Sequence, residues 1–168
     1  IMSGDMQALA AYYQHTPLSP REHTDILHGV TSGFLFATLA RNNDEWPDTD
    51  TLYQATKLIL QQADYSDDAL LAACCNCLVS RNSGAFKALL ESDKITPKIL
   101  SSRIMYEENH STLLGIAFLK KQEAYARQLV EKGATFPQED IENIPSHRYK
   151  WRHLSPQERK VWKVLLSL

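Results

Sequence analysis

The stretch of sequence that decides the fold runs from Thr112 to Ala134 and reads TLLGIAFLKKQEAYARQLVEKGA. It predicts a helix over Thr112–Lys120 and a second helix over Glu123–Lys132. Gly133 follows the second helix, where a glycine supplies the left-handed residue that commonly ends a helix. Large apolar residues of the second helix, such as Leu129, are expected to fill the space between helices. Burying one such leucine contributes roughly 1.5–3 kcal/mol.

This stretch resembles an ankyrin repeat, whose pattern of the same length is TPLHxAAxxGHxEVVxLLLxxGA. The residues that match are Thr112, Leu114, Ala117, Leu129, Gly133 and Ala134, with Val130 as a conservative apolar match. Three positions depart from the pattern. Leu113 stands in place of the proline, Gly115 in place of the histidine that ties the turn to its neighbour, and Lys121 in place of the turn glycine. The resemblance implies a helix-turn-helix unit that stacks on its neighbours and presents a surface to a protein partner.

Weaker copies of this unit occur earlier in the chain. At a shift of 40 residues Leu89-Leu90-Glu91 aligns with Leu129-Val130-Glu131, and at a shift of 30 Ile59-Leu60 aligns with Leu89-Leu90. Ankyrin repeats run about 33 residues, so these spacings imply inserted or trimmed loops. A lone helix pair cannot bury both of its apolar faces, whereas stacked pairs share one core. We therefore expect an all-α fold, a short α-solenoid of stacked helix pairs that is ankyrin-like in its C-terminal half.

We expect one continuous domain in three parts. Residues 1–66 form a divergent helical N-terminal cap or first repeat, residues 67–144 form ankyrin-like repeats, and residues 145–168 form a C-terminal capping helix. The last helix follows Ser155-Pro156-Gln157-Glu158, a capping signature with proline at the first helical position. No strand pattern is found. The earlier helices are predicted at Met6–Gln14, Thr24–Arg41, a segment capped by Asp50 or Thr51, Ala69–Ser80, Ser83–Glu91 and Pro97–Ile104.

The resemblance also implies which residues bind the partner. In the ankyrin family, binding positions lie in the turn before the first helix of a unit and near the end of that helix. Carried onto the matched stretch, they are Glu108, Asn109, Ser111, Leu119 and Lys120. The copy at a shift of 40 adds Asp68 and Ser80, whereas its Leu71 and Val79 are equally suited to the core. Because the backbone is fixed before contact, little ordering entropy is lost on binding. The alternative is that these side chains are only solvated surface.

The bulk composition is that of an ordinary soluble globular chain. The 168 residues carry a net charge of −2, which implies no bulk attraction to nucleic acid. No apolar run approaches the ~18 residues that suggest a membrane span, and no secretory signal is visible at the start. The three cysteines, odd in number and clustered, do not make a disulfide framework. We therefore expect a monomer in a reducing, cytoplasmic compartment.

The chain starts at Ile1 rather than at a methionine, so we expect it to be part of a larger protein. Divergent ankyrin units with irregular spacing are similar to those of secreted bacterial effectors that engage host proteins. The resemblance thus implies a bacterial effector delivered into a host cytoplasm, with a protein as its partner.

The remaining motifs do not favour catalysis. Cys74-Cys75-Asn76-Cys77 contains a single C-x-x-C pair, whereas a structural zinc site needs four ligands, so buried thiols in a tight helix interface are expected. The histidines form neither H-x-x-x-H nor H-E-x-x-H, and the glycines form no phosphate loop. The acid pairs Asp67-Asp68 and Glu107-Glu108 are expected at exposed turns. We expect no enzyme activity, no cofactor and no metal.

Two other functions stay open. The first is a small helical enzyme or regulatory domain that uses the acidic N-terminal half, where residues 1–70 carry ten acids against three bases. It predicts a deep pocket that holds several convergent polar groups, whereas a binding module predicts a shallow groove.

The second is nucleic-acid binding through residues 147–163. This segment begins with His147-Arg148-Tyr149-Lys150-Trp151-Arg152-His153, and interleaved bases and aromatics suit phosphate contact with base stacking. The same residues equally suit an acidic protein surface, or a packed tryptophan with Arg and Lys stems lying along it. Nucleic-acid binding predicts an affinity that falls steeply with salt.

Overall fold

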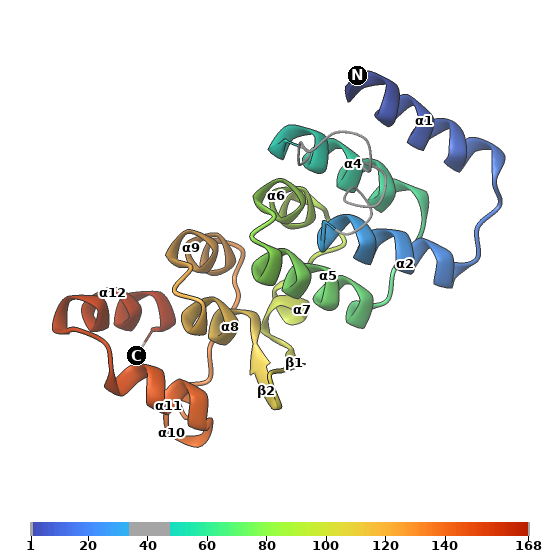
Figure 1. Cartoon of the computed structure of the whole chain (residues 1–168). Coiled ribbons are helices and arrows are strands. Elements are labelled where there is room, and N and C mark those ends of the chain that lie inside the picture. Colours follow the sequence, from blue (N-terminus) through green and yellow to red (C-terminus); the bar gives the residue numbers. More distant parts are fainter. Residues whose placement is uncertain (1, 34–47, 168) are drawn as a thin grey trace. The chain divides into compact units, whose positions relative to one another are not determined.

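The structure is a computed structural model that describes residues 2–33 and 48–167 (Figure 1). Most of the described residues are helical, and the strands among them are the two of one small hairpin, so the expected mainly helical fold is confirmed. The chain forms two compact units, Ile1–Ile95 and Thr96–Leu168. This boundary lies inside the predicted segment 67–144. The second helix, predicted to reach Arg41, ends at Thr31, and residues 34–41 of the prediction fall outside the described residues.

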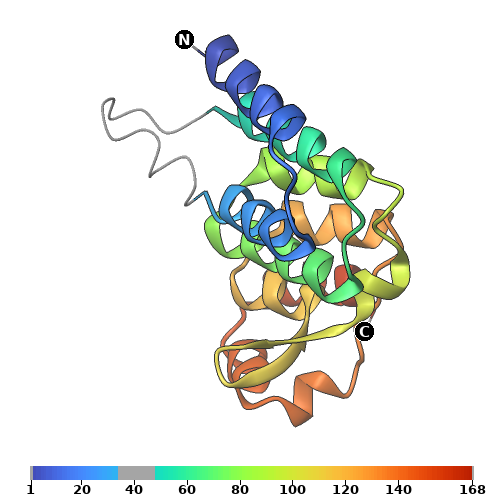
Figure 2. The same ribbon diagram turned by 90° about the vertical axis from the view of Figure 1, so that its right-hand side faces the viewer.

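Unit 1, residues 1–95, is built from helices that pack in pairs. They are α1 (Met2–His15), α2 (Pro20–Thr31), α4 (Thr49–Gln62), α5 (Asp67–Ser80) and α6 (Ser83–Glu91). Helix α2 lies against both α4 and α5, while α6 lies against both α4 and α5 (Figures 1 and 2). The α2–α4 pair therefore stacks on the α5–α6 pair, and α1 covers the other side of α4.

Two helices of unit 1 do not begin where they are predicted to begin. Helix α2 begins at Pro20 rather than Thr24, because Ser19 and Glu22 form a capping box in which the Ser19 N–H donates to Glu22 Oε2 at 2.8 Å. Helix α4 is capped by Asp48 rather than by Asp50 or Thr51, since Asp48 Oδ1 accepts the Thr51 N–H at 2.7 Å.

The three cysteines of α5 are buried, as expected. Cys74 and Cys77 are fully enclosed and Cys75 is 7% exposed, and none forms a disulfide. Burial raises the pKa of the Cys74 thiol to about 12 and raises the pKa of Cys75 and Cys77 as well. Thiols with such pKa values are inert as nucleophiles and metal ligands, so their role in the folded unit is packing.

Unit 2, residues 96–168, contains a β-hairpin and further helix pairs. Its elements are α7 (Pro97–Ser101), β1 (Arg103–Tyr106), β2 (Asn109–Thr112), α8 (Leu113–Leu119), α9 (Glu123–Glu131), α10 (Asp140–Asn143), α11 (Pro145–Arg152) and α12 (Pro156–Leu166). Helix α11 packs on α8, and α12 packs on α9. The predicted helix Pro97–Ile104 is wrong beyond Ser101, where strand β1 follows. Residues 145–168 hold two helices instead of the single one predicted.

An aromatic cluster joins the helices of unit 2. Phe118 of α8 is fully buried, and the centroid of its ring lies 5.2 Å from that of Trp162 in α12, edge to face. The His147 and Trp151 rings of α11 lie 5.9 and 6.2 Å from the same ring. Such aromatic pairs contribute about 0.5–1.5 kcal/mol each beyond the area that they bury. Phe118 is therefore the residue through which α8, α11 and α12 share one core.

Among the described residues, no helix is both long enough and apolar enough to cross a lipid bilayer.

Gly84 provides a test of the close contact between α4 and α6. A Cβ atom at this position would lie 2.0 Å from the Thr49 carbonyl oxygen, which is backbone and cannot rotate away. A glycine-to-alanine change inside a helix ordinarily stabilises it by up to about 1 kcal/mol. Here we expect Gly84→Ala to lower the free energy of unfolding by about 1–3 kcal/mol, measured by urea denaturation. Ser83→Ala, at the exposed neighbouring position, is the control, and equal stability of the two variants would contradict the close contact.

Candidate interaction surface

The hairpin of unit 2 ends in a two-residue turn with unusual residues. Tyr106 pairs with Asn109 across the hairpin, so Glu107 and Glu108 alone form the loop. Their φ angles are 44° and 68°. Two successive positive φ values are the mark of a type I′ turn, which favours Asn-Gly. The left-handed conformation costs a non-glycine residue roughly 1–2 kcal/mol, so the rest of the hairpin has to stabilise this tip.

Contacts to the end of α8 hold one of the two glutamates. The Tyr106 hydroxyl donates to Glu107 Oε1 at 2.6 Å, and Lys120 Nζ reaches the same oxygen at 3.4 Å. The Lys120 ammonium also lies 5.4 Å from the centre of the Tyr106 ring. The hydrogen bond from Tyr106, followed by Lys120, lowers the pKa of the Glu107 carboxyl. The Glu107 side chain is thus directed back onto the hairpin.

The second glutamate of the tip is free. Glu108 is exposed, and its carboxylate makes no hydrogen bond or ion pair to the part of the chain that the structure describes. Asn109 beside it donates through Nδ2 to the Glu107 carbonyl at 3.0 Å, which closes the turn. The tip therefore presents one unpaired carboxylate from a backbone that its neighbours hold in place.

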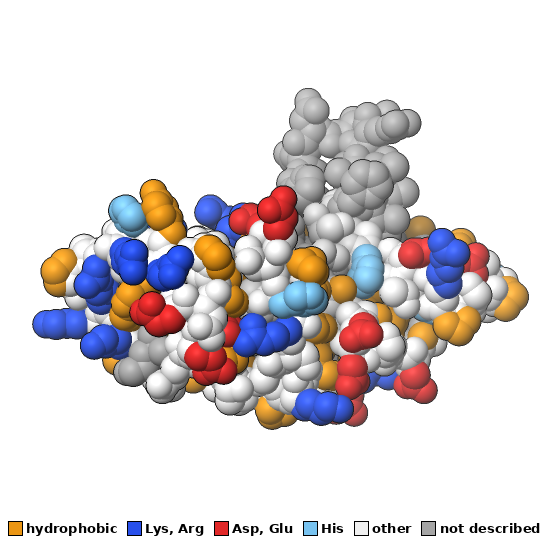
Figure 3. Space-filling view, turned by 90° about the horizontal axis from the view of Figure 1, so that it is seen from below, with side chains coloured by type: hydrophobic (Ala, Val, Ile, Leu, Met, Phe, Trp, Pro, Cys, Tyr) orange, Lys and Arg blue, Asp and Glu red, His pale blue; other side chains and the backbone are white. Residues whose placement is uncertain are grey.

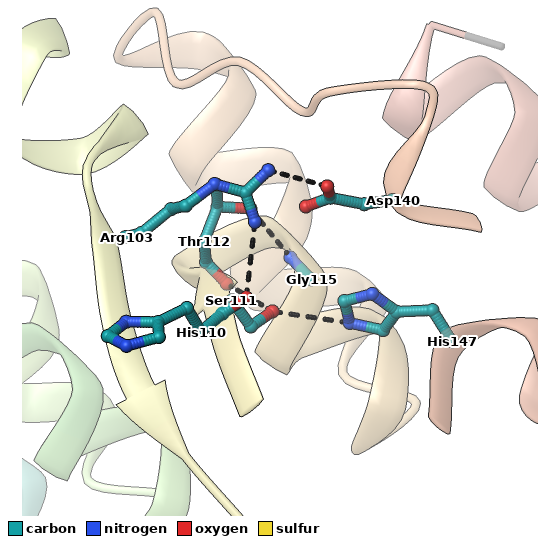
Figure 4. A network of polar contacts seen from close by, with 7 residues as sticks. All are labelled: Arg103, His110, Ser111, Thr112, Gly115, Asp140 and His147. Atoms are coloured by element: carbon teal, nitrogen blue, oxygen red, sulfur yellow. Dashed lines mark hydrogen bonds and ion pairs between the residues drawn. The ribbon is translucent and has the colours of Figure 1, made fainter. Parts of the chain in front are cut away.

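At the base of the hairpin, Arg103 ties β1 to β2 and to α10. Its guanidinium donates through Nη1 to the His110 carbonyl at 3.1 Å and through Nη2 to Asp140 Oδ1 at 2.6 Å (Figure 4). Asp140 is only 2% exposed. The Arg103 side chain is 40% exposed, so the pair is only half-buried, but removal of Arg103 would leave the buried Asp140 carboxylate without its ion-pair partner. The pair therefore fixes where the hairpin begins.

Strand β2 is fixed to α11 through a buried histidine. His147 Nε2 lies 3.2 Å from Ser111 Oγ (Figure 4). Position 115 has no side chain, and a Cβ atom there would lie 2.3 Å from Ser111 Oγ and 2.9 Å from His147 Cε1. Gly115 thus leaves the space that the imidazole fills. Thr112 Oγ1 accepts the Gly115 N–H at 3.2 Å and caps α8, so the hairpin continues into the helix without a loop.

Ser111, His147 and Asp140 are the residue types of a hydrolase triad, but they are packed as a structural network. Each is at most 2% exposed, and Asp140 directs its hydrogen-bonded oxygen at Arg103. A serine nucleophile needs a route to its substrate and a histidine oriented by the acid. The arrangement provides neither in the described conformation, and its evident role is to hold β1, β2, α10 and α11 together.

The structure brings four of the seven predicted binding residues to one part of unit 2. Glu108 lies in the hairpin tip with Asn109 beside it, while Leu119 ends α8 and Lys120 is its C-cap, both half-exposed. The expectation for Ser111 is wrong, because its side chain faces His147 and is 1% exposed.

The two predicted residues of unit 1 are exposed at opposite ends of α5. Asp68 lies in its first turn. Ser80 lies in its last turn, donates to the Asn76 and Thr31 carbonyls, and borders a hollow of about 110 Å³ with Arg81 and Asn82. Leu71 is buried, whereas Val79 is 49% exposed.

Tyr106, which supports the tip, is not among the predicted residues, and Glu107 is predicted only as an exposed turn residue without its contacts to Tyr106 and Lys120. A signal for them exists in the two short segments Arg103–Tyr106 and Asn109–Thr112, separated by two residues as in a tight hairpin. The loop lacks the glycine or asparagine that usually reveals such a turn.

Within residues 2–33 and 48–167, no group of His, Cys, Asp and Glu side chains has the arrangement of a metal site. No protein-family model, no curated protein and no solved structure matches this chain.

The buried histidine predicts how stability changes with pH. Burial lowers the pKa of His147 below 6.5, with Arg103 adding to the effect and the nearby Asp140 carboxylate opposing it. Below pH 6.5 the unfolded chain binds a proton before the folded one does, so stability is lost as the pH falls toward the folded-state pKa. We expect the midpoint of thermal unfolding to fall between pH 7.5 and pH 5, and His147→Gln to reduce this fall.

The matched control is His153→Gln, because His153 is exposed on the same helix. It should leave the pH dependence close to that of the unchanged chain. Equal pH profiles for His147→Gln and the unchanged chain would contradict the role given to the buried imidazole.

Proposed function

We propose that this chain is a protein-interaction module of the ankyrin-repeat kind, and that the hairpin tip and the end of α8 form its contact surface. The observation that carries the proposal is the tip itself. Glu107 and Glu108 both hold left-handed backbone angles that an Asn-Gly pair would adopt without strain. Backbone strain concentrates at functional sites, and here it directs a free carboxylate outward.

Several features support the ankyrin kind. In unit 2 a hairpin precedes a helix pair, Thr112 caps the first helix, and Gly133 ends the second with a φ of 84°. In unit 1 the α5–α6 pair stacks on the α2–α4 pair, and in unit 2 α11 lies against α8 and α12 lies against α9. The ankyrin pattern has a histidine where this chain has Gly115. Here the imidazole of His147 occupies the space next to position 115. An ankyrin-like solenoid is the simplest architecture that accounts for these features together.

Recognition by this surface would depend on rigidity. Lys120, Tyr106 and the network beneath the hairpin fix the tip before any partner arrives, so little ordering entropy is lost on contact. Glu108 supplies the charge, and a partner that offers an arginine or lysine would complement it. As part of a larger protein, such as a bacterial effector, the module would bring its other parts to that partner.

The enzyme alternative predicts a deep pocket in the acidic half of the chain. The larger of the two hollows described in unit 1 has a volume of about 350 Å³ and lies along α4 and α6. Two of its charged lining residues are already engaged, since Glu91 accepts the Tyr53 hydroxyl and Lys94 Nζ contacts Asp64 Oδ1 at 3.0 Å. Groups held in this way are poorly placed to converge on a ligand, which favours the binding module.

The proposal is tested by a change that separates binding from stability. Replacing Glu107 by Asn and Glu108 by Gly removes the carboxylates and relieves the strained turn. We expect this double variant to unfold at a temperature several degrees higher, because about 1–2 kcal/mol of strain is lost. We expect it to lose the proteins that the unchanged chain captures from a lysate, as quantified by mass spectrometry.

Glu108→Arg should also lose those proteins, and Glu131→Arg, an exposed reversal on α9, should keep them. Reversal of Lys120 is a poorer test because Lys120 contacts both Tyr106 and Glu107. Capture that is unchanged in Glu108→Arg and in the double variant would exclude the hairpin tip as the contact surface.

A further inference from the structure

The basic segment that follows α10 forms a helix with one exposed face. Helix α11 exposes Arg148, Tyr149 and Arg152, and His153 follows directly as its C-terminal cap. Arg148 and Arg152 are four positions apart, as are Tyr149 and His153, so these residues lie side by side on one face of the helix. The opposite side carries the buried His147 and the half-buried Trp151. Trp151 is thus packed against the unit, as one of the alternatives for this segment predicts. That packing does not explain the exposed face.

The two aromatic rings of this face, those of Tyr149 and His153, already lie against each other in the free protein. The ring centroids of Tyr149 and His153 lie 4.2 Å apart with an interplanar angle of 31°. His153 Nδ1 donates to the Tyr149 carbonyl at 2.8 Å, which holds the imidazole in this position. Tyr149 is nevertheless 67% exposed. The pair is thus a fixed aromatic platform whose outer surface is open to solvent.

The cations around the platform have no acidic partner. The side chains of Arg148 and Arg152 make no ion pair with any residue that the structure describes. The same is true of Lys160 and Lys163 on α12. Arg159 joins the two helices, because its Nη2 donates to the Arg152 carbonyl at 3.0 Å. Figure 3 shows Lys and Arg side chains gathered over α11 and α12.

The charge of this region differs from that of the whole chain. Unit 2 has twelve Lys and Arg against eight Asp and Glu, a net charge of +4, although the chain as a whole carries −2. Glu158, the acid nearest to the cluster in α12, is held by Lys121 at 2.7 Å and by the Ser155 N–H. Arg148, Arg152, Lys160 and Lys163 are therefore left without an ion-pair partner among the described residues.

We propose that the exposed faces of α11 and α12 form a binding surface for a single-stranded nucleic acid. Unpaired Arg and Lys side chains would contact phosphates, and a base would stack on the open face of Tyr149. An acidic protein would use the cations but not the platform. A membrane surface would need more apolar side chains than Tyr149 and the 77% exposed Val164. The stacked ring pair is the feature that selects a base-bearing partner.

The experiment is fluorescence anisotropy of the full chain with a fluorescein-labelled single strand of about 12 nucleotides. We expect binding at low salt, with log K falling as salt rises at a slope near −3, because about four cations contribute ~0.7 each. Arg148→Glu with Arg152→Glu should weaken binding more than tenfold and reduce the slope by about half. Tyr149→Ala should weaken binding by about tenfold, while Tyr149→Phe should retain it.

The control for charge is Arg127→Glu in α9 with Lys132→Glu at its C-cap, two exposed reversals that change the net charge by the same amount. It should retain most of the affinity. Circular dichroism of each variant checks that the fold is kept. The surface is independent of the hairpin tip, so Glu108→Arg should bind the strand as the unchanged chain does, whatever becomes of the proposed protein partner.

Three outcomes would overturn the proposal. The first is the absence of binding at low salt. The second is an equal loss of affinity in the Arg127→Glu, Lys132→Glu control, which would show that only net charge matters. The third is full affinity in Tyr149→Ala together with equal competition by a polyglutamate peptide, which would assign the surface to an acidic protein.

Discussion

The packing of unit 2 depends on the missing side chain at position 115. Because Gly115 has no Cβ, the imidazole of His147 enters the space beside α8 and meets Ser111. The same imidazole lies against Phe118, through which α8, α11 and α12 share a core. A larger residue at position 115 would displace a fully buried ring, and neighbouring elements packed at interior density cannot shift without loss of contacts.

This constraint explains why a strained turn can persist at the end of a short hairpin. Four-residue strands supply few hydrogen bonds, and an isolated hairpin is only marginally stable in water. Here β1 is tied to α10 by Arg103, β2 continues into α8, and Lys120 of that helix contacts the tip. The helices therefore stabilise a turn that its own residues disfavour. A rigid base that fixes a charged end agrees with the proposed contact surface, since binding sites work best on rigid elements.

The sequence predicts the regular helices well and the hairpin poorly, for identifiable reasons. Helix α6 has the predicted bounds of Ser83–Glu91, and α12 begins with the predicted capping box at Ser155. The same signature occurs at Ser19-Pro20-Arg21-Glu22, where the helix begins four residues before the predicted Thr24. The hairpin escapes prediction because its turn residues are glutamates, whose presence there depends on tertiary support.

In the candidate site, too, some features could be predicted from the sequence and others could not. The exposure of Glu108 follows from its place in a turn. The burial of Ser111, three residues after Glu108, could not be predicted, because the alternation along a strand becomes visible only once the strand is known. His147 lies within a run of bases and aromatics, so its complete burial could not be expected without the space at Gly115.

The three buried thiols of α5 can report how often this helix separates from its neighbours in unit 1. Cys74, Cys75 and Cys77 form no disulfide and have raised pKa values, so a thiol reagent can react at an appreciable rate only with molecules in which the helix has transiently separated from its neighbours. The speed of their alkylation in the native protein would therefore report the free energy of that local opening, without any label having to be introduced.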